Sequence, residues 1–427
     1  MCVCVEPLVA HPPIRVGSLP SYILLSLFEF CFAALTMYYL CSGFCAAGQS
    51  DYLLPLTYFK HIGELRFGIL TQLASWQLAL GEEVRLSCDP VVFTPDDTFV
   101  YAGLLTAPEI VERVKNLKPA TKLETTLEGK RVVLAYRAAS VGERCGDNMA
   151  HVEEVVCEQE ENMCCVTRSW HIFACAEKAI AFDFDRLTTG RQSAALDPSV
   201  RVCGQHPIFV EEGAKLWDCT LNASEGPIYI GAEAEVMEGA HIRGSFALGI
   251  HSVVKMGAKI YGATTIGPHC KVGGELANVN FQGYSNKAHD GFLGNSVIGS
   301  WCNLGADTNC SNLKNTYDEV RVWSVPDNTF VRTGQQFCGL LMGDHSKTGI
   351  NTMLNTGTVI GAFCNIFGGG FPRTWIPPFS WGGSAGFKPH DITTALETAK
   401  RVMARRGVAI SQEMEDAARK LHTQTVK

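Results

Sequence analysis

The chain has 427 residues and a formal net charge of −7 at pH 7. This length allows two or three domains with a large core, and the mildly acidic balance argues against a nucleic-acid-binding protein. Its 18 cysteines are irregularly spaced and include no C-x-x-C pair. That pattern predicts reduced, mostly buried thiols in a cytosolic protein, and neither a disulfide framework nor a metal site.

An apolar run occupies residues 22–47 and is interrupted by a single charge, Glu29. It is long enough to cross a bilayer as a helix, which needs roughly 20 residues. It makes a poor signal peptide, because it is too long, only Arg15 precedes it and no A-x-A site stands out. We therefore expect residues 1–51 to be an extension outside the working protein, a membrane anchor or a buried helix. The protein is expected to be cytoplasmic unless residues 22–47 anchor it to a membrane.

Residues 52–200 are expected to form an α/β domain. Strand-like runs at 98–105 and 131–138 alternate with a helical run at 108–118, as is typical of this fold class. The chain contains neither a G-x-x-x-x-G-K-[ST] nor a G-x-G-x-x-G phosphate-binding motif.

From Pro227 the sequence repeats with a period of six. Eight consecutive aliphatic residues keep this spacing: Ile230, Val236, Ile242, Leu248, Val254, Ile260, Ile266 and Val272. A period of six fits neither a helix nor a single strand. It is typical of a parallel β-solenoid, in which three hexads close one coil and the coils stack about 4.8 Å apart. We expect this solenoid to span residues 205–370.

The period lapses twice within the solenoid. After Val272 it resumes with Phe292, and after residues 312–341 it resumes with Met342. We expect the chain to leave the coil at both places. Loops on a rigid scaffold often carry function, and the first lapse contains His289.

Residues 371–427 begin with a segment rich in Gly and Pro and are expected to end in two helices. Asp391 is a suitable N-cap for a helix that ends at Gly407, and a second helix follows Ser411. The first helix carries a run of basic residues: Lys400, Arg401, Arg405 and Arg406. This run is either a solvated helix face or a contact for the phosphates of a nucleotide-like cofactor.

Several long motifs resemble those of one enzyme family. NKAHDGFLGNSVIGSWCNLGADTNCSNLKN (286–315), together with the hexads, resembles the acetyltransferase half of the bifunctional N-acetylglucosamine-1-phosphate uridylyltransferase/glucosamine-1-phosphate acetyltransferase family. LLPLTYFKHIGELRFGILT (53–71), RSWHIF (168–173) and FCGLLMGDHSKTGINTMLNTGTVIG (337–361) are similar to its bacterial sugar-nucleotidyltransferase-like branch. The resemblance covers residues 52–417.

This resemblance implies a homotrimer of left-handed parallel β-helices, with acetyl-CoA and a sugar phosphate bound between neighbouring coils. By the same resemblance His289 is the general base, and Asn303 and Asn312 contact the sugar phosphate or the acetyl group. Lys287 and Lys314 are candidates for the phosphate contacts.

The resemblance and the basic run together make Lys400 and Arg401 candidates for binding acetyl-CoA. One position departs from the family pattern, because the tyrosine expected three residues after the histidine is Phe292. Tyr284 is a candidate for supplying the missing hydroxyl.

The expected chemistry needs a base at His289. Acetyl transfer requires an amine with a free lone pair, and histidine is the side chain whose pKa suits removal of that proton near neutral pH. A backbone N–H or an Asn amide should face the developing oxyanion, and Lys or Arg should hold the phosphate. A satisfied loop histidine is the alternative reading, which the motif around His289 disfavours.

The uridylyltransferase half of the family carries an N-terminal strand and a glycine-rich loop, and the chain is expected to lack both. The place where an aspartate would hold Mg²⁺ reads Ala102-Gly103, while Asp96 and Asp97 read as a turn. Mg²⁺ is therefore expected only if nucleotidyl transfer survives. Lys60 and Arg66 remain candidates for phosphate contacts, against core-edge or surface roles.

Three functions are compatible with these patterns. The first is acetyl transfer from acetyl-CoA to an amino-sugar 1-phosphate in nucleotide-sugar biosynthesis. The second is sugar-1-phosphate nucleotidyl transfer, with the solenoid as a trimerisation platform. The third is a non-catalytic scaffold or sugar-phosphate sensor, which only the apolar N-terminus supports.

Overall fold

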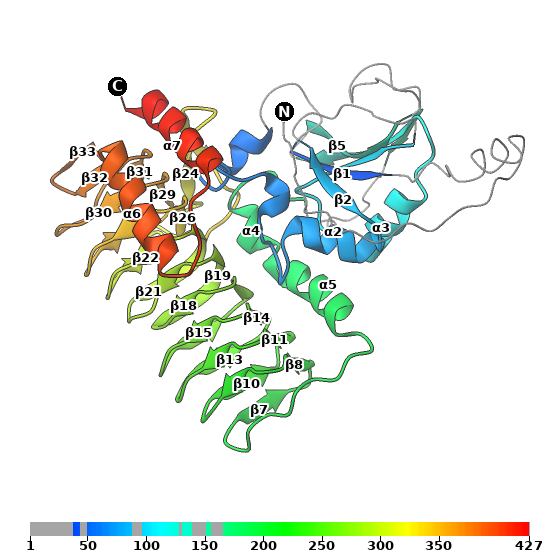
Figure 1. Cartoon of the computed structure of the whole chain (residues 1–427), viewed down its shortest axis with the longest axis horizontal. Coiled ribbons are helices and arrows are strands. Elements are labelled where there is room, and N and C mark those ends of the chain that lie inside the picture. Colours follow the sequence, from blue (N-terminus) through cyan, green and yellow to red (C-terminus); the bar gives the residue numbers. More distant parts are fainter. Residues whose placement is uncertain are drawn as a thin grey trace, which may run out of the picture. The chain divides into compact units, whose positions relative to one another are not determined.

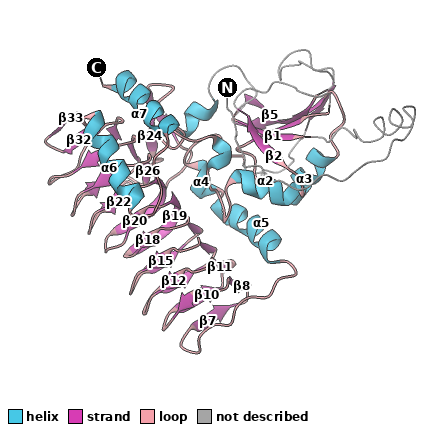
Figure 2. Cartoon of the chain, in the orientation of Figure 1, coloured by secondary structure: helices cyan, strands magenta, loops and turns pink. Residues whose placement is uncertain are grey.

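The computed structural model describes residues 37–42, 49–87, 96–127, 130–138, 151–154 and 165–426. An N-terminal α/β domain is followed by a parallel β-helix and two C-terminal helices, which confirms the predicted fold class (Figures 1 and 2).

The α/β domain is built on a six-stranded sheet of order β2-β1-β3-β5-β4-β6. Its strands are β1 (Tyr38–Cys41), β2 (Val84–Ser87), β3 (Thr98–Tyr101), β4 (Thr121–Leu127), β5 (Lys130–Arg137) and β6 (His151–Glu154). Strand β1 runs parallel to both β2 and β3, and β5 runs antiparallel to β3 and β4. The helical segments are η1 (Gln49–Leu53), η2 (Ile62–Glu64), α2 (Gln72–Leu80), α3 (Pro108–Lys115), α4 (His171–Ala174) and α5 (Ala176–Thr188).

Strand β1 corrects the predicted domain boundary. Tyr38–Cys41 lies inside the apolar run that we assigned to an extension, yet it is a fully buried central strand of the sheet. Its apolar side chains pack in the core of the α/β domain, so hydrophobicity here reflects a two-sided buried parallel strand. The expectation that the domain lacks its first strand is therefore wrong. The rest of the run, 22–36 and 43–47, lies outside the described residues.

No helix within the described residues is long and apolar enough to cross a membrane.

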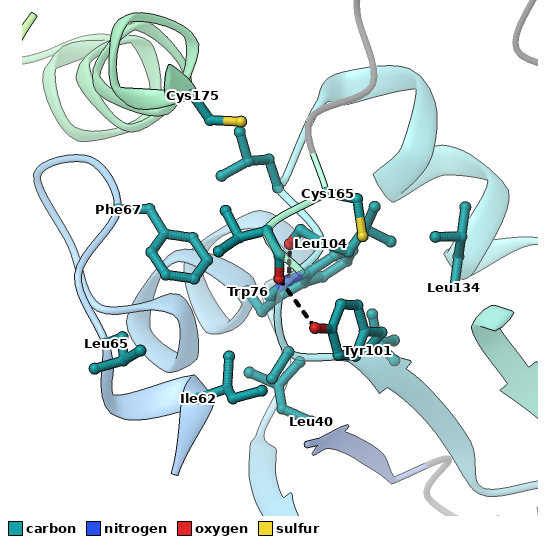
Figure 3. Packing of buried hydrophobic residues seen from close by; sticks show 14 of the residues in the cluster. Leu40, Ile62, Leu65, Phe67, Trp76, Tyr101, Leu104, Leu134, Cys165 and Cys175 are labelled. Carbon is teal, nitrogen blue, oxygen red and sulfur yellow. Dashed lines mark hydrogen bonds between the residues drawn. The ribbon is translucent and has the colours of Figure 1, made fainter. Parts of the chain in front are cut away.

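The end of β3 is closed by the chain that follows residue 164 (Figure 3). Tyr101 Oη donates to the Val166 carbonyl (2.9 Å), and the Trp76 indole N–H donates to the Leu104 carbonyl (3.0 Å). A Cβ on Gly103 would lie 2.3 Å from the Val166 oxygen, so only glycine fits this close approach. The end of the predicted strand, YAGLL (101–105), is thus buried in the core of the α/β domain.

The β-helix has three faces, here called A, B and C. Face A contains β9 (Lys215–Leu216), β12 (Glu235–Val236), β15 (Val253–Val254), β18 (Lys271–Val272), β20 (Asn286–Lys287), β22 (Asn303–Leu304), β27 (Lys347–Thr348), β30 (Asn365–Ile366) and β32 (Ser380–Gly383), with β33 (Gly386–Pro389) antiparallel to β32. Face B contains β7 (Arg201–Gly204), β10 (Thr220–Ala223), β13 (His241–Arg243), β16 (Lys259–Tyr261), β23 (Asn309–Cys310) and β28 (Met353–Leu354). Face C contains β8 (Ile208–Val210), β11 (Ile228–Ile230), β14 (Phe246–Leu248), β17 (Thr264–Ile266), β26 (Leu340–Met342), β29 (Thr358–Ile360) and β31 (Trp375–Ile376). Two longer strands, β19 (Glu275–Gly283) and β21 (Phe292–Ser300), cover faces B and C in turn.

The hexad aliphatics fill the interior of the coil, as the period predicts. Residues at equivalent positions pair in parallel register, for example Leu221 with Ile242 and Ile242 with Ile260. Their side chains are buried and belong to one core cluster. Each coil covers the apolar interior of the next, so the stack as a whole, not any single coil, supplies the burial that stabilises the fold.

The first lapse in the period is not a place where the chain leaves the coil. After Val272 the interior positions are Leu276, Phe281, Lys287 and Leu293, each in register with the neighbouring coils. The expected resumption at Phe292 is wrong by one residue. The step from Val272 to Leu276 is only four residues because β18 and β19 are joined by two residues, 273–274, whereas five of the other corners between faces A and B have four residues and the corner 217–219 has three.

The second lapse does leave the coil, as predicted. It carries an antiparallel hairpin, β24 (Arg321–Ser324) with β25 (Thr329–Arg332), and the chain rejoins the coil at β26.

The two predicted C-terminal helices are confirmed. Asp391 caps α6 (Ile392–Ala404) by accepting from the Thr394 N–H, and Ser411 caps α7 (Gln412–Thr425) by accepting from the Met414 N–H. The apolar face of α6 packs with Phe363 and Phe379 at the last coils.

Contacts between the α/β domain and the β-helix use the segments that carry the family resemblance. The Lys60 ammonium pairs with Asp344 (2.8 Å) and donates to Ser300 Oγ (2.7 Å). The Arg66 main chain bonds to the Gln282 side chain, while its own side chain is partly buried and donates to the Ile69 carbonyl. These contacts favour the core-edge role for Lys60 and Arg66 over the predicted phosphate contacts.

Candidate functional site

His289 lies in a recess at the corner between faces A and B. It belongs to the four-residue turn 288–291 that joins β20 to β21, and its side chain is exposed. Because the preceding turn has only two residues, a hollow of about 660 Å³ opens beside it. We call this hollow the His289 recess; it is lined by Lys255, Met256, Gly274, Ala288, His289, Asp290, Ala306 and Asp307.

The main chain of this turn is hydrogen-bonded to the next coil along the chain. The Asp307 N–H donates to the Asp290 carbonyl (3.0 Å), and the Phe292 N–H donates to Asn309 Oδ1 (2.8 Å). A Cβ on Gly291 would lie 2.4 Å from the Thr308 carbonyl oxygen, so glycine is needed there. The His289 side chain therefore projects from an ordered main chain into solvent-accessible space.

Lys287 does not face a ligand. Its side chain is fully buried, and its ammonium donates to the carbonyls of His289 (2.7 Å), Asp290 (3.1 Å) and Gly273 (3.3 Å). Burial lowers the pKa of Lys287 to about 8, and Asp290 and Asp307 oppose this shift. An ammonium has three donors and all are used, so the predicted phosphate contact at Lys287 is wrong.

Asn303 lines a second hollow on the outer surface of face A, of about 300 Å³. We call it the cationic groove; it is lined by Lys271, Tyr284, Asn286, Ala288, Trp301, Asn303, Val402, Arg405 and Arg406. Ala288 borders both hollows. The groove and the His289 recess therefore adjoin along β20, with three cations at the groove and the histidine in the recess.

The basic run of α6 is divided between two roles. Arg405 and Arg406 line the groove. Lys400 pairs with Glu415 of α7 (2.6 Å), and Arg401 pairs with Glu397 (3.0 Å) one helical turn away. Lys400 and Arg401, the predicted cofactor contacts, thus form ion pairs on the surface of α6 and α7, and Arg405 and Arg406 after the end of the helix line the groove.

Asn312 and Lys314 lie at a different corner from His289. Asn312 Nδ2 donates to Asn295 Oδ1 (2.8 Å), and Asn295 Nδ2 in turn donates to the Asn278 side-chain oxygen (3.0 Å) when that amide is oriented to satisfy its neighbours. These residues form an asparagine ladder between faces B and C. The Lys314 ammonium donates to the Glu319 carbonyl (2.6 Å) inside the extruded loop. Within one chain, neither residue lies at the recess, so both stay predictions for a site that includes a neighbouring copy.

A column of aromatic rings forms the corner between faces C and A, at one wall of the groove. Its members stack in order with centroids 4.1–6.2 Å apart: His251, His269, Tyr284, Trp301, His345, Phe363 and Phe379. Tyr284 and Trp301, at 4.1 Å, are the pair that lines the groove. Tyr284, the candidate for supplying the hydroxyl that Phe292 lacks, therefore lines the groove and not the His289 recess.

Among the described residues of the α/β domain, no carboxylate directly follows β3, where a nucleotidyltransferase metal would be expected. Strand β3 is followed by Ala102-Gly103, and Asp96 at its other end pairs with Arg137 (3.0 Å). In the described ranges, no group of three or more His, Cys, Asp or Glu residues could hold a metal ion. The residues that are described do not fit a magnesium site, and we derive no step through one.

Comparison with known proteins supports the predicted resemblance. Residues 47–192 match a protein-family model described as sugar nucleotidyl transferase. This part of the chain resembles the sugar nucleotidyl transferases. A bifunctional sugar-1-phosphate nucleotidylyltransferase/acetyltransferase of Sulfurisphaera tokodaii is 35% identical over 81 residues, which are 19% of this chain and 20% of that protein. The bifunctional protein GlmU of Methanococcus vannielii is 36% identical over 74 residues, 17% of each chain. The matches thus span about a fifth of the length of these relatives.

Solved structures of low overall similarity include two acyltransferases. The polySia-specific acetyltransferase NeuO matches with a TM-score of 0.26 and 11% identity, over 49% of this chain and 99% of that one. The Arabidopsis UDP-N-acetylglucosamine acyltransferase matches with a TM-score of 0.26 and 17% identity, over 54% and 90%. Likeness at these TM-scores says nothing about activity.

Sequence reasoning missed Lys255 and Asp307 in the recess and Lys271 and Asn286 in the groove. A signal existed for the recess, because the spacing from Val272 to the next buried aliphatic, Leu276, is four residues instead of six. The groove residues had no such signal, since they come together only when coils stack and α6 packs against them.

Proposed function

We propose that this protein is a cytoplasmic N-acetyltransferase that moves an acetyl group from acetyl-CoA to the amine of an amino-sugar 1-phosphate such as glucosamine 1-phosphate. One observation carries the proposal: an exposed histidine sits in a recess made by a shortened turn, and a groove lined by three cations adjoins it. The matched relatives, whose names include sugar-1-phosphate nucleotidyl and acetyl transfer, support the choice of substrate class.

In the proposed reaction the neutral amine of the sugar attacks the thioester carbonyl, and His289 accepts a proton from its nitrogen as the bond forms. The C–N bond forms, the C–S bond breaks, and the proton held by the imidazole passes to the departing thiolate. A base of this kind is typically worth roughly 10² to 10⁴ in rate. The proposed donor to the oxyanion is the Asn303 side-chain amide, since a neutral donor aimed at developing charge stabilises it.

The charges around the two hollows suggest how the substrates are held. Arg405, Arg406 and Lys271 are the proposed contacts for the phosphates of acetyl-CoA, since guanidinium and ammonium groups bind phosphate strongly. Lys255 in the recess is the proposed contact for the phosphate of the sugar. We further propose a homotrimer, in which a neighbouring copy completes the binding of both substrates, and a role in UDP-N-acetylglucosamine and related nucleotide-sugar biosynthesis.

The test is release of CoA from acetyl-CoA in the presence of glucosamine 1-phosphate. We expect turnover by the full chain and a loss of at least about a hundredfold in His289→Ala. His206→Ala is the matched control, because His206 is also exposed but lies in the first coil, and it should keep full activity. If the unmodified chain releases no CoA with any amino-sugar phosphate, or if His289→Ala is as active as the control, the proposal is wrong.

A second candidate is sugar-1-phosphate nucleotidyl transfer by the α/β domain. The family match over residues 47–192 and the central position of β1 favour it. Pyrophosphate release from nucleoside triphosphates and a sugar 1-phosphate tests it directly. A chain inactive in both assays would instead fit a scaffold or sugar-phosphate sensor.

A further inference from the structure

Lys287 occupies a position that the hexad pattern reserves for aliphatic residues. It is in register with Val272 in the coil above, and its neighbour Asn286 pairs with Asn303, which places Leu304 beneath it. Its side chain is fully buried in this apolar column. A buried charge is costly unless its hydrogen bonds are satisfied, so the contacts of the ammonium explain why a lysine is tolerated here.

The turns between faces A and B normally bond to one another through the main chain. In four of them an N–H donates to a carbonyl of the turn before it: Gly239 to Asp218, Gly257 to Glu238, Asp307 to Asp290 and Asn351 to Ala306, at 2.8–3.0 Å. Within the described part of the chain, the turn 288–291 makes no main-chain bond of this kind. The reason is geometric, because the turn above it is two residues shorter.

The Lys287 ammonium bridges this gap. It donates to the Gly273 carbonyl in the shortened turn (3.3 Å) and to the His289 and Asp290 carbonyls in the turn below (2.7 and 3.1 Å). The two turns are in close contact, since a Cβ on Gly274 would lie 2.8–2.9 Å from main-chain atoms of residues 289–291. The ammonium supplies a hydrogen-bonded link between them, and it does so at the main chain of the proposed base.

We propose that Lys287 is a positioning residue: its buried ammonium ties the turn 288–291 to the shortened turn 273–274 and so sets where the His289 side chain enters the recess. The catalytic meaning rests on the proposed function, but the tie itself does not. A displacement of about 1 Å in a catalytic group can cost about a hundredfold in rate, so an untied turn should slow the chemical step without weakening the binding of acetyl-CoA.

The experiment compares Lys287→Met with Leu304→Met. Methionine suits the aliphatic column, and Leu304→Met places the same side chain one coil away without removing the ammonium, so it controls for repacking. The rate of amide hydrogen exchange at residues 288–291, measured by mass spectrometry, reports whether the turn is held in place. Initial rates of CoA release give kcat and the KM for acetyl-CoA.

In Lys287→Met we expect exchange at 288–291 to be at least about tenfold faster than in Leu304→Met, with other coils unchanged. We expect kcat to fall at least about tenfold while KM for acetyl-CoA stays within about twofold. Equal exchange in the two variants, or faster exchange spread over all the coils, would overturn the proposal. If exchange quickens only at 288–291 and the unmodified chain releases no CoA, the tie stands and the proposed function fails.

Discussion

The buried ammonium of Lys287 makes a prediction about stability that is independent of catalysis. Burial lowers its pKa from an ordinary 10.5 to about 8. Below pH 8 the lysine is protonated in both the folded and the unfolded chain, so it adds no pH dependence there. Between about pH 8 and pH 10.5 the unfolded chain binds more protons than the folded one, so the free energy of unfolding rises with pH.

The size of this rise follows from the pKa difference. At about 1.4 kcal/mol for each unit, a pKa lowered by about 2.5 corresponds to about 3 kcal/mol in total. Lys287→Met has no proton to release and lacks this gain. Relative to the unmodified protein, the variant should therefore lose about 3 kcal/mol of stability as the pH is raised from 7 to 10.5.

Urea unfolding of both proteins at several values between pH 7 and pH 10.5 measures this difference. Other groups that titrate in the same range, including the buried cysteines, are common to both proteins and cancel in the comparison. A difference that stays constant within about 1 kcal/mol would refute the reasoning, since the pKa of Lys287 would then not be lowered in the folded protein.

Three further outcomes are expected. Inserting two residues between Gly273 and Gly274 should restore a four-residue turn and fill the recess. The rate of CoA release should then fall at least about a hundredfold with an unchanged melting temperature. Retained activity would show that the reaction does not need the recess. Arg405→Ala should raise the KM for acetyl-CoA about tenfold in initial-rate measurements, whereas Arg401→Ala, whose guanidinium pairs with its own helix, should not; equal effects would contradict the assignment. Lys60→Met leaves the buried Asp344 carboxylate without its cation, so denaturant unfolding should show a loss of about 3 kcal/mol, and a loss below about 1 kcal/mol would argue against this contact as a major link.

Much of the architecture could be predicted from the sequence because its causes are local. The hexad period follows from the geometry of a coil that turns every six residues, and the buried column from Ile230 to Val272 keeps it without exception. The caps at Asp391 and Ser411 act within one helical turn. The departure of the chain from the coil within residues 312–341 could be predicted because charged residues cannot line an apolar interior.

The site depended on contacts between segments far apart in the sequence. A lysine two residues from a histidine suggests a ligand contact, yet the Lys287 side chain is buried and donates to the carbonyls of Gly273 and His289. Asn312 matched a site motif, but coil stacking placed it in an asparagine ladder at another corner.

What the sequence alone determined is the repeat, the exposed histidine and the end helices, because these depend on spacing along the chain. What only the tertiary structure decided is which polar groups are satisfied by the neighbouring coil and which remain free. Tyr38–Cys41 became a central strand only through its partners on both sides. Arg405 became a groove residue because α6 ends over face A. Hydrogen bonds and burial depend on contacts between coils and helices. The cations that line the groove, Lys271, Arg405 and Arg406, therefore come together only in the folded stack of coils.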